Sequence, residues 1–237
     1  LISYTTSILA RSFDENEGGF GSQSKFPNSM SLEVFLRNYA RTGQPQDLDR
    51  VTMTLGKMAN GGIYDHLGGG FHRYSVDHKW LVPHFEKMLY DNALLSKVYF
   101  QTYQITEDPQ FLKVGTETLD YVLREMTSDE GAFCSTQDAD TEGGEGRFFL
   151  WTSDEVLNVL GQEQGEIFCA AYDVDDVGNF EGKSILNRPV STEDIAAQYK
   201  LTVEELEATM QENRERLLEE RANRVHPSRD DKVQVSW

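Results

Sequence analysis

Apolar residues recur at helical spacing in one segment after another, and this periodicity constrains the fold more than any other feature. In residues 31–42 the sequence SLEVFLRNYART places apolar side chains three and four positions apart, which is the pattern of one buried helix face. The same spacing returns in residues 46–59, 84–105, 109–126 and 203–224. Strand-like signals are short, and the best candidate is GRFFLW at 146–151. The sequence therefore predicts a mainly α chain with small β pieces in its loops.

Helix ends are marked by capping signals. Ser31 is expected to cap the first of these helices, and Gly43 to stop it. Asp108 followed by Pro109 is typical of a cap and a first helical position. Two threonines followed three residues later by glutamate match the capping box: Thr152 with Glu155, and Thr202 with Glu205.

Long loops separate the helices and resemble one another. Residues 17–27, 61–80, 130–151 and 177–189 each place glycine beside an aromatic or aliphatic residue and then add polar groups. Long loops that are not of low complexity are usually functional. A helix pair followed by such a loop, repeated, predicts stacked helical hairpins with their functional loops on one face.

Charge and cysteine content exclude several classes of protein. With a formal net charge of −18, the chain has no basic stripe to neutralise nucleic-acid phosphates, and an anionic membrane surface is disfavoured as well. No apolar run is long enough for a membrane-spanning helix. Cys134 and Cys169 form neither a CxxC pair nor a zinc spacing. We expect two reduced thiols in a cytoplasmic protein.

The stretch VPHFEKMLYDN at 82–92 is unusually polar and mixed for the opening of a helix. His84 is predicted to lie at the helix N-terminus, where the dipole favours the neutral imidazole and suits an acid–base group. Lys87 and Asp91 would share its helix face, and Glu86 and Tyr90 another. The alternative is a solvated first turn with surface ion pairs.

Four of the five histidines fall within residues 66–84. None is spaced from another as a helical metal pair, so a metal site has little support. Such histidines are commonly loop residues satisfied by hydrogen bonds. His72 and His84 are the two that we also consider for chemistry.

Acidic residues gather in the loop QDADTEGGEG. Asp138 and Asp140 alternate, and Glu142 and Glu145 follow. The spacing is not that of an EF-hand. Paired carboxylates in a cleft suit glycoside hydrolysis, and the alternative is a solvated acidic turn.

Aromatic residues flank these polar groups, as in a sugar-binding platform, although an ordinary core also contains them. They are Tyr64, Phe71, Tyr74, Trp80, Phe85, Tyr90, Phe148 and Trp151.

Three long blocks resemble one known family. GGIYDHLGGGFHRYSVDHKWLVPHFEKMLYDNALL, FCSTQDADTEGGEGRFFLWT and RVHPSRDDKVQVSW are similar to signatures of the YyaL family, also called DUF255, of spermatogenesis-associated thioredoxin-like proteins. In the third block, Ser228-Arg229 stands before Asp230 and Asp231 where the family usually has a leucine.

The resemblance implies a fold and a domain organisation. The family's helical part is similar to the six-hairpin (α/α)6 toroids of N-acylglucosamine 2-epimerases and several glycosidases. Residues 1–237 would form a partial toroid, without the thioredoxin-like domain and the second half of the toroid. An uncovered toroid edge would favour self-association.

Three functions follow as hypotheses. In a sugar 2-epimerase or isomerase, His84 would be the base, with His72 or a carboxylate as its partner, while Arg73 and Lys87 would steady the enolate oxygen. A glycoside hydrolase would use Asp138 or Asp140 with Glu86. A non-catalytic scaffold would bind a sugar or a protein and work with a redox domain.

The candidate residues fall into two groups, and the expected ligand is a small carbohydrate, with no metal and no cofactor. The catalytic candidates are His84, Glu86, His72, Asp138 and Asp140. The substrate-binding candidates are Tyr64, Arg73, Trp80, Lys87, Tyr90, Asp91, Asn92 and Glu145.

Overall fold

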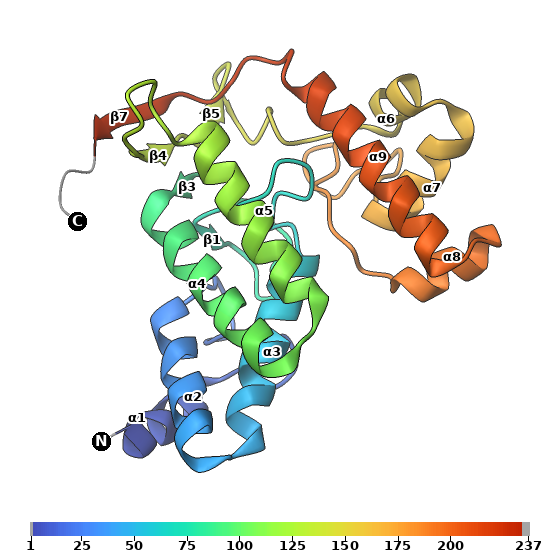
Figure 1. The fold of residues 1–237 in the computed structure, drawn as a ribbon. Helices are drawn as coiled ribbons and strands as arrows, with labels where there is room; N and C mark the ends of the chain where they lie inside the picture. Colours follow the sequence, from blue (N-terminus) through green and yellow to red (C-terminus); the bar gives the residue numbers. More distant parts are fainter. Residues whose placement is uncertain (1, 234–237) are drawn as a thin grey trace.

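The computed structural model describes residues 2–233, and its helices pair into hairpins (Figure 1). The last residues of the third family-like block lie outside this range. The helices are α1 (Ile2–Leu9), α2 (Ser29–Thr42), α3 (Pro45–Asn60), α4 (Leu89–Thr106), α5 (Pro109–Glu125), α6 (Ser153–Leu160), α7 (Gln162–Tyr172), α8 (Thr192–Tyr199) and α9 (Val203–Arg221), with a 3-10 turn at Ala10–Ser12 after α1. Over residues 2–233, no helix combines the length and apolarity that crossing a bilayer requires.

Most of the predicted helix ends are confirmed. Asp108 caps α5 by accepting a hydrogen bond from the Gln110 amide. Both predicted capping boxes are formed, at the starts of α6 and α9. Gly43 ends α2 in the left-handed region, with φ of 69°, where glycine is favoured. The prediction for Ser31 was wrong, because α2 already begins at Ser29 after Asn28.

The helix predicted at 84–105 begins only at Leu89. His84 belongs instead to β2 (Pro83–His84), and Lys87 to β3 (Lys87–Met88). The reason is long-range pairing, since His84 lies opposite Tyr74 and Lys87 opposite Gln137. Backbone groups of this segment are thus satisfied by neighbouring strands. The argument from the helix dipole for His84 was therefore wrong.

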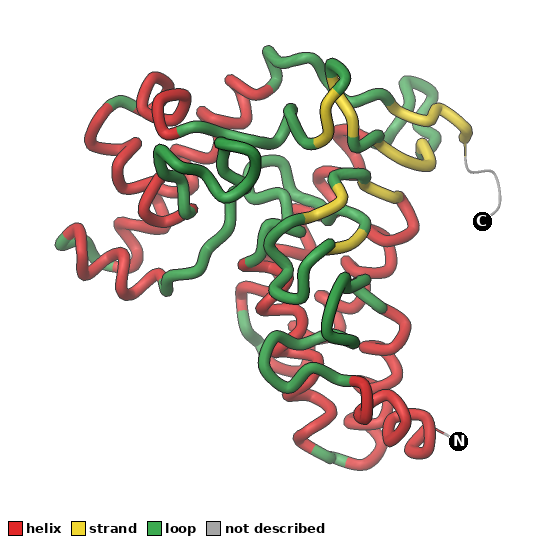
Figure 2. The backbone as a smooth tube through the Cα atoms, turned by 180° about the vertical axis from the view of Figure 1, so that it is seen from behind, coloured by secondary structure: helices red, strands yellow, loops and turns green. Residues whose placement is uncertain are grey.

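Short strands occupy the loops between the helices (Figure 2). β1 (Tyr74–Ser75) pairs with β2, and β5 (Asp140–Thr141) pairs with β6 (Gly144–Glu145). β3, β4 (Cys134–Gln137) and β7 (Arg229–Val233) form an antiparallel sheet in the order β3-β4-β7. These pairings bring the loops at 61–88 and 134–145 together.

The strand predicted at 146–151 was wrong. Phe149 and Leu150 donate their backbone N–H groups to the Gly146 carbonyl, at 2.8 and 3.2 Å, in a turn. Only Trp151 forms a bridge, to Ser184. The aromatic residues that suggested a strand are instead buried side chains of a turn.

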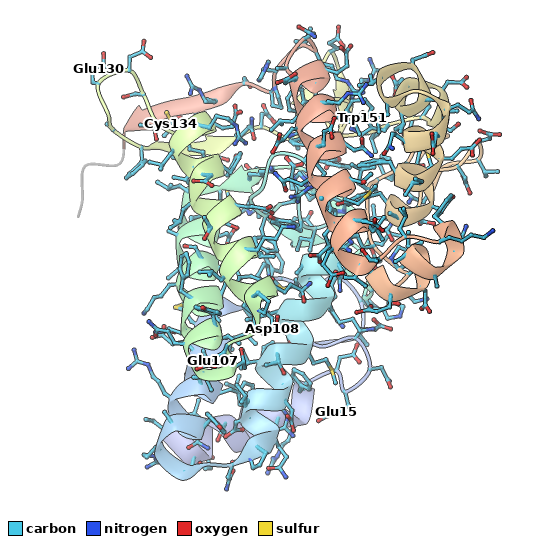
Figure 3. All side chains as sticks on the ribbon, turned by 45° about the vertical axis from the view of Figure 1, so that its right-hand side comes forward. Glu15, Glu107, Asp108, Glu130, Cys134 and Trp151 are labelled. Atoms are coloured by element: carbon cyan, nitrogen blue, oxygen red, sulfur yellow. The ribbon has the colours of Figure 1, made fainter. Side chains whose placement is uncertain are left out.

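Two large hydrophobic clusters lie on either side of these loops. One joins α2, α3, α4 and α5, and the other joins α6, α7, α8 and α9. A smaller cluster that includes Phe85, Phe149 and Ile185 packs beneath the strands. We call α2–α5 and α6–α9 the two hairpin groups, and side chains fill both of them in Figure 3. In that view Glu107 and Asp108 mark the turn between α4 and α5, and Cys134 lies at the opposite end of that helix pair. The strand-bearing loops therefore rest on a packed base.

Candidate functional site

Polar side chains from two strand pairs and the residues beside them meet around His84. We call this group the His84 cluster, and its members are Arg73, Tyr74, His84, Glu86 and Glu145. Pairing of β1 with β2 sets Tyr74 beside His84, and Glu145 belongs to β6, which is held by its pairing with β5. The cluster therefore depends on contacts between residues that are distant in the sequence.

His84 is held by a carboxylate on one ring nitrogen. Its Nδ1 lies 2.7 Å from Glu145 Oε1, which also accepts the Phe85 N–H at 3.2 Å. Its Nε2 lies 3.8 Å from Glu86 Oε2. The side chain is 31% exposed. If Nδ1 donates its proton to Glu145, the lone pair of Nε2 remains for a proton transfer.

Glu86 is anchored on the other side by Arg73. Arg73 Nη1 donates to Glu86 Oε2 at 2.7 Å, and the Arg73 backbone N–H donates to the Glu86 carbonyl at the same distance. The hydrogen bond that Arg73 donates to Glu86 raises the pKa of Arg73. A fixed cation thus sits beside the imidazole and its carboxylates.

An aromatic stack covers one side of the imidazole. The Tyr74 ring stacks on His84 with centroids 5.1 Å apart, and the Phe26 ring stacks on Tyr74 at 4.8 Å. Phe26 is 49% exposed. Sequence reasoning missed Phe26 as a site residue, although its loop carries the same glycine–aromatic pattern as the others.

Tyr90 and Asp91 lie in the first turn of α4, next to the cluster. Tyr90 is 50% exposed. Burial, opposed by Arg73 and assisted by Glu86, raises the pKa of the Asp91 carboxyl to about 6. Asp91 is therefore poised between its acid and carboxylate forms near neutral pH.

His72 does not reach the surface. It is buried beneath Phe85, whose carbonyl lies 2.8 Å from His72 Nδ1. Burial, together with the nearby Lys87, lowers the pKa of His72 to about 3. The imidazole is neutral in this state, and His72 is not a member of the His84 cluster.

Lys87 is also placed differently from our expectation. Its side chain is 0% exposed, and its Nζ donates to Asp65 Oδ2 at 2.8 Å and to the Gly69 carbonyl at 2.9 Å. Arg221 completes the group through hydrogen bonds to both Asp65 oxygens, at 2.8 and 2.9 Å. Burial lowers the pKa of Lys87 to about 8. This side chain holds β3 to α9 and does not face an open surface.

Three further candidates lie in the core. The Tyr64 hydroxyl donates to Glu117, and the Trp80 indole N–H donates to the Glu17 carbonyl at 2.8 Å. Asn92 bonds both backbone groups of Phe71. All three candidates are buried, and the structure does not bring them to the His84 cluster.

The two candidate aspartates are exposed and are not members of the His84 cluster. Asp138 is exposed and accepts a hydrogen bond from Ser228 Oγ at 3.1 Å. Asp140 is exposed and lies opposite Glu145 in the β5–β6 pair. Only Asp140 is thereby linked to a member of the His84 cluster. Within residues 2–233, no three His, Cys, Asp or Glu side chains gather closely enough to hold a metal ion.

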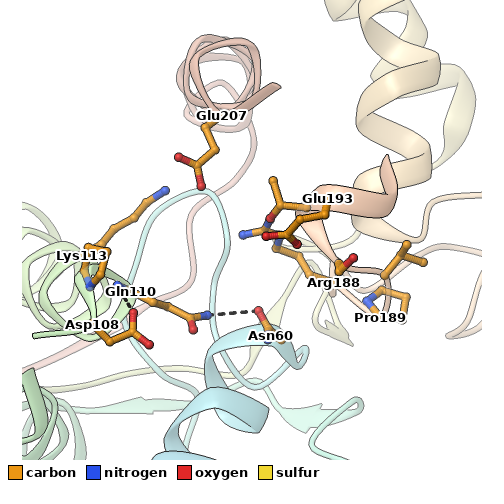
Figure 4. A pocket seen from close by; sticks show the side chains of 12 residues that line it. Asn60, Asp108, Gln110, Lys113, Arg188, Pro189, Glu193 and Glu207 are labelled. Atoms are coloured by element: carbon orange, nitrogen blue, oxygen red, sulfur yellow. Dashed lines mark hydrogen bonds between the residues drawn. The ribbon is translucent and has the colours of Figure 1, made fainter. Parts of the chain in front are cut away.

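A separate hollow of about 590 Å³ opens between the two hairpin groups (Figure 4). Lys113 of α5 and Glu207 of α9 project into it from one side, and Arg188 and Glu193 from the other. Gln110 donates to Asn60 Oδ1 at 3.3 Å on its floor. The lining mixes both charges and includes no member of the His84 cluster.

No family model matches the chain. Its sequence is 36% identical to spermatogenesis-associated protein 20 of Mus musculus over 97% of the chain, and 34% identical to the protein of the same name from Homo sapiens. The chain belongs to the family of spermatogenesis-associated protein 20. It spans 33% of the length of these family members.

Solved structures show the fold of this family segment. A sugar epimerase from a ruminal bacterium aligns with a TM-score of 0.51 and 15% identity, over 69% of the chain and 46% of the epimerase. Cellobiose 2-epimerase from Bacillus thermoamylovorans aligns with a TM-score of 0.51 and 14% identity, over 70% of the chain and 48% of that enzyme. At this identity the likeness concerns the fold alone. It is that of helical hairpins from an (α/α)6 toroid, as predicted.

Proposed function

We propose that this chain carries the acid–base site of a sugar 2-epimerase or isomerase, with His84 as the base. The observation that carries the proposal is the fixed imidazole, held 2.7 Å from Glu145 at Nδ1 and partly exposed at the surface. The two epimerases that share the fold make a sugar the first ligand to test.

Residues of this chain would supply the base and the partner of the developing oxyanion. In an open-chain aldose, Nε2 of His84 would take the proton from C2, and the electron pair would move toward the carbonyl oxygen to give an enediolate. Arg73 would stabilise the negative oxygen. Return of a proton to the other face of C2 gives the epimer, and delivery of a proton to C1, with transfer of the O2–H proton to O1, gives the ketose.

The stacked rings of Phe26 and Tyr74 would hold the sugar. Apolar sugar faces pack on aromatic rings, while their hydroxyls need polar partners at the edge. Phe26 is half exposed and Tyr74 stacks directly on His84, so a ring bound there would lie beside the imidazole. Tyr90 would contact the sugar from α4.

The full-length protein would complete the site. The chain spans a third of its family members and less than half of the epimerases that share its fold. We propose that further hairpins close the toroid over the His84 cluster and that a thioredoxin-like domain forms part of the same protein.

Hydrogen exchange tests this proposal. The full-length protein and its His84→Ala variant are incubated in D2O with N-acetylmannosamine, glucose, mannose and cellobiose, and proton NMR follows the C2–H signal. We expect exchange in the wild type, its loss in His84→Ala, and full exchange in His78→Ala, whose histidine is exposed. Absence of exchange in the folded wild type would contradict the proposal and favour a binding scaffold. Release of a reducing sugar without exchange would favour a hydrolase.

A further inference from the structure

Arg73 and Asp91 each carry a buried polar atom without a hydrogen-bond partner among the described residues. The two atoms are Nε of Arg73 and Oδ2 of Asp91. One is a donor and the other an acceptor, yet they do not bond each other. Buried polar groups normally have partners, so this pair is suited to a group that both donates and accepts, such as a hydroxyl.

The place of Asp91 in α4 does not explain it as a helix cap. An acid in the first helical turn commonly accepts a backbone N–H or offsets the helix dipole. At the start of α4 no side-chain cap bond is formed, and burial works against the charged form of Asp91. The fold therefore places a carboxyl group at the site and leaves one of its oxygens unused.

Glu86 cannot take the same role. Its Oε2 is bound to Arg73 at 2.7 Å and faces His84 at 3.8 Å. Glu145 is bound to His84 and to the Phe85 amide. Among these three carboxylates, Asp91 is the one that makes no ion pair in the described part of the chain.

We infer that Asp91 is the second proton-transfer group of the site and acts together with His84. This inference rests on the proposed function. Asp91 in its acid form would donate its proton to the carbonyl oxygen as His84 breaks the C2–H bond, so that a neutral enediol forms. On the way to the ketose, the O2–H proton then passes to Asp91 while His84 delivers its proton to C1, so that both groups return to their starting forms. Arg73 would hold the same oxygen, and no oxidant or reductant is needed.

The test compares Asp91→Asn with wild type in the full-length protein, using C2–H exchange on the sugar that the wild type accepts. Asparagine keeps the shape and cannot carry the proton. We expect the exchange rate to fall by about 10²- to 10³-fold, while the matched Asp49→Asn variant, altered at an exposed residue of α3, keeps the wild-type rate.

The pH profile separates proton transfer from a structural effect. The charged groups that face Asp91 are Arg73 and Glu86. As an acid, Asp91 is active when protonated, so wild-type exchange should fall as the pH rises above about 6. The residual exchange of Asp91→Asn should not show this fall. A carbon-13 NMR titration of the wild-type Asp91 carboxyl gives a readout that does not depend on the variant's folding, with an expected midpoint near 6.

The outcomes distinguish this inference from the proposed function. Exchange that requires His84 but persists at full rate in Asp91→Asn would overturn this inference and leave the proposed function in place. An Asp91 midpoint near the ordinary aspartate value of about 3.9 would do the same. Absence of exchange in the wild type would overturn both.

Discussion

His84 Nδ1 and Glu145 Oε1 lie 2.7 Å apart although 61 positions separate the two residues in the chain. The contact joins β2 to β6. The same carboxylate oxygen accepts the Phe85 N–H, so it fixes both the imidazole and the backbone beside it. Glu145 is thus a positioning residue for His84.

Glu145→Gln should slow the proposed exchange reaction without preventing sugar binding. The amide keeps the shape but removes the negative charge that would stabilise the imidazolium formed in the reaction. We expect kcat to fall by about 10²-fold with KM little changed, measured by C2–H exchange in the full-length protein. Glu142→Gln, at an exposed residue of the turn between β5 and β6, is the control and should keep the wild-type kcat. An unchanged kcat in Glu145→Gln would show that His84 does not depend on this carboxylate.

The helices could be predicted from the sequence because their signals are local. Periodic apolar residues and caps such as Thr152 and Asp108 act within a few positions, and both caps form. The loops were also correctly recognised as the part of the chain where polar and aromatic residues gather. Secondary structure within those loops depends on distant partners, so the segment with His84 resembles a helix start until β1 and β4 are placed beside it.

Buried charges are the second kind of feature that the sequence conceals. Lys87 was expected to steady the enolate oxygen beside His84, but its side chain is buried. Its partner Asp65 is 22 positions away, and Arg221 is 156 positions from Asp65. Only the folded chain brings the three together, and a lysine with such partners can be buried.

Asp65→Asn should therefore destabilise the protein strongly. The change leaves Lys87 and Arg221 buried without their shared carboxylate, and breaking a buried ion pair in this way costs about 3–5 kcal/mol. Urea unfolding at pH 7 would measure the loss. Asp120→Asn, at an exposed position of α5, should change the free energy of unfolding by no more than about 0.5 kcal/mol. If Asp65→Asn lowered the free energy of unfolding no more than Asp120→Asn does, the buried group would contribute little to stability.

We expect the free energy of unfolding to decrease as the pH falls, because His72 is buried. The folded pKa of about 3 lies below the ordinary histidine value of 6.5, chiefly because of burial. Between these values only the unfolded chain binds the proton, so stability is lost as the pH falls below 6.5. Between pH 6.5 and 5 the loss from this group is about 2 kcal/mol.

His72→Asn tests this dependence, because its amide can still donate to the Phe85 carbonyl and cannot titrate. We expect the variant to be less stable at pH 7 but to lose less stability than wild type between pH 7 and 5, by urea unfolding at both values. His78→Asn, at an exposed loop position, serves as the control and should follow the wild-type dependence. Parallel losses in wild type and His72→Asn would rule out His72 as a source of acid sensitivity.

Phe26→Ala should weaken sugar binding while leaving the fold intact. Phe26 is 49% exposed and contacts Tyr74 at 4.8 Å between ring centroids, so its removal exposes little core and leaves the imidazole in place. Loss of one aromatic contact of about 1 kcal/mol should raise KM several-fold with kcat nearly unchanged, because the ring would bind the ground state and transition state alike. Met30→Ala, at a more exposed apolar residue of α2, should leave KM unchanged. A lower kcat at constant KM would instead place Phe26 among the residues that orient His84.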